Sequence, residues 1–105
     1  MNKYFFVIVL LLTSLIFAGD FGFISGTITD KNSGDTLPGV QIVIEGTDYG
    51  AVTNIDGYYE IYKVPPGEYE LFIEYLGYTS IQVMGVNVVA DSTTTLDLKM
   101  DQGNI

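Results

Sequence analysis

The stretch Glu68-Tyr69-Glu70-Leu71-Phe72-Ile73-Glu74-Tyr75 alternates between acidic and mostly apolar side chains with a period of two residues. Successive side chains of a β-strand point to opposite faces. Tyr69, Leu71, Ile73 and Tyr75 therefore share one face, and the glutamates share the other. We expect the first face to lie in a core and the second in water.

The same alternation recurs along the chain, and no stretch shows a sustained helical period. We predict seven strands, at about residues 23–29, 39–46, 50–53, 58–63, 68–75, 79–89 and 93–100. Strands with one apolar face need a second sheet to pack against, which predicts an all-β sandwich. The side chains expected in its core are Ile24, Ile28, Val40, Ile42, Ile44, Tyr59, Ile61, Tyr69, Leu71, Ile73, Tyr75, Leu96 and Leu98.

Turn-forming residues separate the predicted strands. Asp56-Gly57 is a tight turn, because Gly57 supplies the positive φ that such a turn needs. The prolines of Pro65-Pro66-Gly67 end the preceding strand, because proline cannot donate a hydrogen bond to a sheet. We assign structural turn roles to Gly39, Gly46, Asp56, Gly57, Pro65 and Gly67.

The first 18 residues have the layout of a secretory signal peptide. Lys3 gives a positive start, residues 4–12 are apolar, and Ala18 is a small residue before the expected cut. A membrane-spanning helix needs roughly 20 continuous apolar residues, and this run is shorter and is interrupted by hydroxyl side chains. We expect a signal peptide at residues 1–18, a domain at 19–101, and a connector or truncated end at 102–105, with the coding sequence continuing beyond it.

Composition restricts the partners. The chain has 4 Lys and Arg residues against 13 Asp and Glu residues, so its net charge is −9. Nucleic acid and anionic lipid surfaces are bound through basic side chains, so neither is an expected partner. Membrane association is expected only through a larger polypeptide or a partner. The chain has no cysteine, which excludes a disulfide framework and an acylated-cysteine anchor.

The sequence offers few of the residue types that enzymes use for catalysis. The absence of histidine and cysteine removes the usual zinc sites, the Ser-His-Asp arrangement and thiol nucleophiles. A pair of carboxylates can hydrolyse a glycoside, but with 13 acids on a short chain some pair falls at any chosen distance by chance. We predict no catalytic residue, no cofactor and no metal.

A calcium site in the loop from Asp48 to Asp56 is an alternative, because Asp48, Asn54 and Asp56 offer oxygen ligands. The spacing does not match the twelve-residue calcium loop. Asn54 and Asp56 are also residue types that hydrogen-bond the backbone of their own turn, which is the interpretation we favour.

Five apolar side chains lie opposite the predicted core, and they form a candidate contact patch: Phe23, Val43, Tyr58, Tyr62 and Phe72. Such a patch suits a protein partner or the stacking of a sugar ring. The alternative is that these side chains are scattered singly, or are covered by a loop or a neighbouring domain.

The chain resembles the carboxypeptidase regulatory-like domain in five motifs, taken in this order: Gly26-x-Ile28-x-Asp30, Leu37-Pro38-Gly39-Val40-x-Ile42-x-Ile44-x-Gly46-Thr47, Thr53-Asn54-x-Asp56-Gly57-x-Tyr59, Val64-Pro65-x-Gly67-x-Tyr69-x-Leu71 and Tyr75-x-Gly77-Tyr78. The order and spacing are specific, although each motif alone is weak. The main departure is Asn54, where the family more often has Asp.

The resemblance implies a seven-stranded antiparallel transthyretin-like sandwich, also grouped with carbohydrate-binding-like folds, and it does not imply an enzyme. In SusC-type TonB-dependent receptors this domain follows the signal peptide and precedes the plug and barrel, an order similar to the one seen here. We therefore expect a binding or spacer module in the periplasm, at the N-terminus of an outer-membrane transport receptor of a Gram-negative-type bacterium, with the plug and barrel or another protein as partner. The alternatives are a stand-alone secreted module that binds carbohydrate or protein, and an accessory domain of an exported carboxypeptidase.

Overall fold

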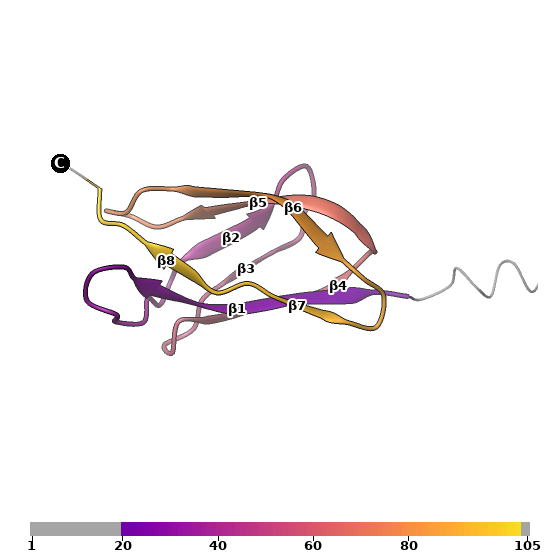
Figure 1. Ribbon diagram of the computed structural model, residues 1–105, viewed down its shortest axis with the longest axis horizontal. Helices are drawn as coiled ribbons and strands as arrows, with labels where there is room; N and C mark the ends of the chain where they lie inside the picture. The colour runs from indigo at the N-terminus through magenta and orange to yellow at the C-terminus, as the bar shows by residue number, and fades with distance from the viewer. Residues whose placement is uncertain (1–19, 104–105) are drawn as a thin grey trace, which may run out of the picture.

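The computed structural model describes residues 20–103, so the predicted signal peptide lies outside the described residues (Figure 1). Residues 20–103 form eight strands and no helix, and so offer no helix that could cross a membrane. The strands are β1 (Gly22–Asp30), β2 (Gln41–Ile44), β3 (Gly50–Val52), β4 (Tyr58–Val64), β5 (Gly67–Glu74), β6 (Ile81–Val88), β7 (Thr93–Thr95) and β8 (Leu98–Met100).

Two sheets pack face to face (Figure 1). The first has the order β4-β1-β7, with β8 also paired to β1, and the second has the order β3-β2-β5-β6. The predicted all-β sandwich is confirmed. The strand count is eight rather than seven, because the strand expected at residues 93–100 is interrupted at Leu96 and Asp97.

The direction of one strand differs from expectation. β1 runs parallel to β7, with Phe23 opposite Thr93, and parallel to β8, with Ile28 opposite Leu98. The pairs β1–β4, β2–β3, β2–β5 and β5–β6 are antiparallel. A fully antiparallel sandwich is thus wrong for the first and last strands. A parallel pair needs a long crossover connection, and here β4 and the whole second sheet lie between its two members in the sequence.

The core lies between the sheets. Most of the predicted core side chains are at most 1% exposed, namely Ile24, Ile28, Val40, Ile42, Ile44, Tyr59, Ile61, Leu71 and Ile73. Four are partly buried and pack against these, namely Tyr69, Tyr75, Leu96 and Leu98. The rest of the core consists of Leu37, Val64, Val86, Val88 and Met100.

The interruption between β7 and β8 is bridged by hydrogen bonds. The Thr27 N–H donates to Oδ1 of Asp97 at 2.8 Å, so a side chain replaces the backbone acceptor of a regular ladder. The Leu96 carbonyl accepts the Tyr59 hydroxyl at 2.6 Å. A Cβ at position 26 would lie 1.9 Å from that carbonyl oxygen, so only Gly26 allows this approach.

The chain beyond Met100 stays paired to the connection between β5 and β6. The Thr79 N–H donates to the Asp101 carbonyl at 2.8 Å, and the Gly103 N–H donates to the Gly77 carbonyl at 2.9 Å. Gln102 forms an antiparallel bridge with Tyr78. Residues 102 and 103, which we expected in a connector, therefore hydrogen-bond into the sandwich.

Candidate interaction surfaces

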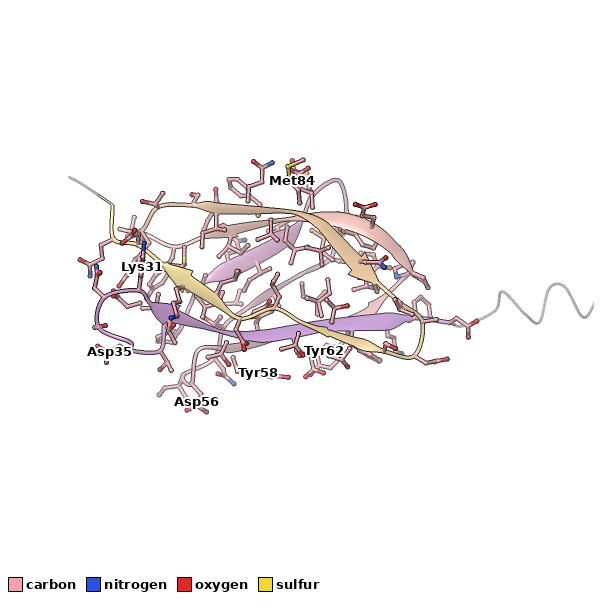
Figure 2. The ribbon with its side chains drawn as sticks, viewed as in Figure 1. Lys31, Asp35, Asp56, Tyr58, Tyr62 and Met84 are labelled. Carbon is pink, nitrogen blue, oxygen red and sulfur yellow. The ribbon has the colours of Figure 1, made fainter. Side chains whose placement is uncertain are left out.

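The structure does not bring the five residues of the predicted contact patch together. Phe23 on β1 and Tyr58 and Tyr62 on β4 lie on the outer face of the first sheet. Val43 on β2 lies opposite Phe72 on β5, on the outer face of the second sheet. Tyr58 and Tyr62 consequently lie on one side of the sandwich and Met84, on β6, on the other (Figure 2). A single patch is wrong, and two surfaces replace it.

We call the first surface the aromatic face, made of Phe23, Tyr58, Glu60 and Tyr62. The Phe23 and Tyr62 rings meet edge to face, with centroids 6.4 Å apart and planes at 85°. The Glu60 carboxylate lies between the two tyrosines, and it accepts the Tyr58 hydroxyl at 3.5 Å. Hydrogen bonding to Glu60 also raises the pKa of Tyr62. The Tyr62 side chain remains 62% exposed, so its ring is available to a ligand.

We call the second surface the acidic face, made of Val43, Glu68, Glu70, Phe72, Glu74, Gln82 and Met84. Its centre consists of three apolar side chains. Val43 on β2 lies opposite Phe72 on β5, and Met84 on the neighbouring strand β6 is 75% exposed. Three glutamates, Glu68, Glu70 and Glu74, lie on β5 before and after Phe72, and Glu70 accepts a hydrogen bond from the Gln82 amide. An exposed apolar centre with a charged rim is typical of surfaces that bind protein.

The charge is distributed unequally between the sheets. β2, β3, β5 and β6 contain no lysine or arginine. Lys63 lies in β4, Lys99 in β8, and Lys31 directly after β1. The second sheet therefore carries uncompensated negative charge, which attracts a basic partner.

Sequence reasoning missed Met84. The predicted strand 79–89 includes it, but no face was assigned there, because the alternation changes phase within the strand. The structure shows the cause: the pairing of β5 with β6 shifts between Tyr69 and Leu71, beside Gly85, whose φ is 70°. A glycine inside an apolar strand was the available signal for such a bulge.

A hydrogen-bond network at Asp30 was also missed. Oδ1 of Asp30 accepts the backbone N–H groups of Asn32 and Ser33, at 2.8 and 3.0 Å. Oδ2 accepts the Tyr78 hydroxyl at 2.6 Å and lies 3.4 Å from Nε2 of Gln102. The Tyr78 bond and the two backbone bonds lower the pKa of Asp30 from 3.8 to about 2. This one carboxylate joins the end of β1, the connection before β6 and the segment after β8.

The turn residues lie between or beside the strands, as their assigned roles require. Gly39, Gly46 and Gly57 have φ of 85°, 76° and 75°. The Pro65 carbonyl accepts the Tyr69 hydroxyl at 2.6 Å, and Gly67 is the first residue of β5. Asp56 is exposed in the turn before β4.

In the loop from Asp48 to Asp56, the alternative calcium site, the Asn54 side chain hydrogen-bonds the backbone of its own turn. Oδ1 of Asn54 accepts the N–H groups of Asp56 and Tyr58, each at 3.0 Å. This oxygen is therefore used by the turn itself. Within residues 20–103, no cluster of three or more acidic side chains is arranged to hold a metal ion.

Comparison with known proteins agrees with this architecture. The family model of the CarboxypepD_reg-like domain matches residues 24–105. TonB-dependent receptor P3 of Formosa agariphila is 34% identical over 82 residues, which are 78% of this chain and 8% of the receptor. TonB-dependent receptor P39 of the same organism is 38% identical over 60 residues, which are 57% of this chain and 6% of that receptor. A crystal structure of a type II cohesin–X-dockerin complex from Acetivibrio cellulolyticus is similar with a TM-score of 0.70 and 26% identity, covering 80% of this chain and 60% of that one.

Two packed sheets with exposed side chains on both outer faces define a small β-sandwich module. Since the family model matches most of the chain, the chain belongs to the CarboxypepD_reg-like domain family. It spans only 8% of the length of receptor P3 and 6% of that of receptor P39. It therefore corresponds to one small module of these relatives.

Proposed function

We propose that this chain is a non-enzymatic, periplasmic N-terminal domain of a TonB-dependent outer-membrane transport receptor, where it binds protein. The observation that carries this proposal is the pattern of coverage, because residues aligned to receptor P3 make up 78% of this chain but only 8% of the receptor. The predicted signal peptide directly before the domain supports the same placement.

The size and location of the native product test this placement. An antibody raised against residues 20–103 is used to blot fractions of cells that carry the gene. We expect a band far larger than a 105-residue chain, in the outer-membrane fraction. A small soluble product in the periplasm or medium would overturn the receptor proposal and favour the stand-alone module.

The acidic face is the surface we assign to the partner. Its apolar centre and its uncompensated glutamates suit a protein surface with apolar and basic side chains, such as a basic patch on the plug or barrel. Electrostatic complementarity of this kind sets the orientation and the rate of docking and weakens as salt rises.

Photo-crosslinking distinguishes the two faces. A crosslinking amino acid replaces Met84 in the acidic face or, as the matched control, Tyr62 in the aromatic face. We expect position 84 to crosslink to receptor segments outside the domain or to an envelope protein, and Glu68→Lys with Glu74→Lys to remove that product. Equal crosslinking from position 62, or no effect of the charge reversal, would exclude the acidic face as the contact.

A second candidate function is carbohydrate binding on the aromatic face. The exposed Tyr62 ring beside the Glu60 carboxylate combines a stacking surface with a hydrogen-bond acceptor. Because the chain has no tryptophan, tyrosine fluorescence can report on binding. Titration with a soluble neutral glucan should change this fluorescence in the parent domain and not in Tyr62→Ala. An identical response of the two proteins would exclude this face.

A further inference from the structure

The first and last strands of the domain are direct neighbours. β1 lies inside the first sheet, and β7 and β8 follow one another along its free side. The strands run in the same direction, so β1 begins at one end of the sandwich and β8 finishes at the opposite end (Figure 1). The two ends of the described chain therefore leave the sandwich at opposite ends.

This arrangement determines how tension acts. If the two ends are pulled apart, β1 and the β7–β8 edge are drawn past one another along their own length. The hydrogen bonds between parallel strands are evenly spaced along them and cross the direction of such a pull. Many of these bonds are then loaded together, whereas a pull at one end of the strand pair would break them one at a time.

The hydrogen bonds between these strands extend along the length of β1. Beside the paired stretches Phe23–Ser25 with Thr93–Thr95 and Ile28–Asp30 with Leu98–Met100, they include Phe23 N–H to the Ser92 carbonyl at 2.9 Å, Leu96 N–H to the Ser25 carbonyl at 2.7 Å, and Lys31 N–H to the Met100 carbonyl at 2.9 Å. At the interruption between β7 and β8, Oδ1 of Asp97 accepts the Thr27 N–H at 2.8 Å. Asp97 thus maintains the connection where the backbone ladder is broken.

Both ends of this strand pair are also secured. At the start, the Asp91 N–H donates to the Phe21 carbonyl at 2.8 Å. At the C-terminal end of the pair, the Asp30 carboxylate accepts hydrogen bonds from the Tyr78 hydroxyl and from the side-chain amide of Gln102. In the middle, the Tyr59 hydroxyl holds the Leu96 carbonyl from inside the core.

We propose that the domain is a force-bearing spacer, in which β1 and the β7–β8 edge form a shear clamp that resists tension between the ends of the domain. The proposal rests on the proposed function only for the origin of the tension, which is a position between two anchored parts of an envelope receptor. The clamp itself is a property of residues 20–103.

Single-molecule force spectroscopy in two pulling geometries tests the clamp. The natural chain has no cysteine, so introduced cysteines give unique handles on the domain, made as residues 19–105, because residues 20–103 enclose a core of their own. Asp20→Cys with Gly103→Cys loads the clamp in shear. Asp20→Cys with Ala90→Cys applies the force at one end of the same strand pair, beside the hydrogen bond from the Asp91 N–H to the Phe21 carbonyl, so that the bonds break one after another. We expect a clearly higher unfolding force in the first geometry.

Asp97 variants test the bridging side chain within the shear geometry. Forced unfolding is governed by the unfolding rate, and losing a hydrogen bond to a charged acceptor raises that rate by about tenfold at a fixed load. We expect this for Asp97→Ala. Asp97→Asn keeps an acceptor oxygen and should restore most of the resistance. Asp48→Ala removes an exposed carboxylate between β2 and β3, away from the clamp, and should have no effect.

Two results would overturn the proposal: equal unfolding forces in the two geometries, or an Asp97→Ala domain as resistant as the parent. These results concern the isolated domain and leave the receptor placement intact. A small soluble native product would instead reject the receptor placement and leave the mechanical result standing.

Discussion

The approach of Gly26 to Leu96 gives the sharpest stability prediction. A Cβ at position 26 would lie 1.9 Å from the Leu96 oxygen, 2.6 Å from its carbonyl carbon and 3.1 Å from the Tyr59 ring. Two of these atoms belong to the backbone, so they can move only if the β7–β8 edge moves. We therefore expect Gly26→Ala to displace that edge from β1.

The size of the effect follows from what the displacement breaks. Overpacking a well-packed site costs about 1–3 kcal/mol. The bonds of the Leu96 N–H to Ser25 and of the Tyr59 hydroxyl to Leu96 are worth about 1 kcal/mol each. Alanine is up to about 1 kcal/mol better than glycine in a strand, which offsets part of this loss. We expect Gly26→Ala to lower the free energy of unfolding by about 2–4 kcal/mol.

Denaturant titration of residues 19–105 measures this change, and Gly34→Ala is the matched control. Gly34 has φ of 78° and nothing within 4 Å of an added Cβ. That variant suffers only backbone strain, which costs about 1–2 kcal/mol. If Gly26→Ala were no more destabilising than Gly34→Ala, the close packing of Leu96 on β1 would be refuted.

Three further predictions address the core, the buried carboxylate and the turn. Leu71→Ala should cost about 2–5 kcal/mol in denaturant titration and Glu70→Ala under about 0.5, and equal tolerance would mean that the register of β5 is wrong. Because folding lowers the pKa of Asp30 to about 2, the ionised carboxylate adds to the free energy of unfolding above its ordinary pKa of 3.8. This stabilisation is lost as pH falls from about 4 toward 2. Asp30→Asn should therefore be less stable than the parent above pH ~4, with the difference shrinking toward pH ~2; a gap that stays constant would contradict this account. Thermal melting with calcium and then with a chelator should give the same midpoint, because Asn54 is used by its own turn, and a rise of several degrees with calcium would reverse that interpretation.

The sequence was informative wherever a short-range pattern decided the structure. Alternation placed Leu71 and Ile73 in the core and the β5 glutamates outside it, because the two faces of a strand follow directly from its period. Gly57 marked its turn because few other residues adopt its φ of 75°. These features depend on neighbours within a few positions.

Features that depend on distant segments were not predictable in the same way. Alternation tells which side chains point outward but not from which sheet, so Phe23 and Phe72 were grouped although they lie on opposite sides of the sandwich. The parallel pairing of β1 with β7 and β8 joins residues about 70 positions apart, as Thr27 and Asp97 show. At the break, Gly26 leaves room for the Leu96 carbonyl and the Tyr59 hydroxyl donates to it, and both residues lie on other strands.

The two sheets divide the proposed roles between them. The first sheet contains β1, β7 and β8, so tension between the ends passes through it directly. The second sheet contains neither β1 nor β8, although its β5–β6 connection binds the C-terminal segment, where the Gly103 N–H donates to Gly77. This sheet carries the acidic face and has no lysine or arginine in its strands. A partner bound to the acidic face would therefore contact β2, β5 and β6 without replacing any hydrogen bond of the clamp. In such an arrangement the domain can hold a partner and carry load at the same time, because the two tasks use opposite sides of one core.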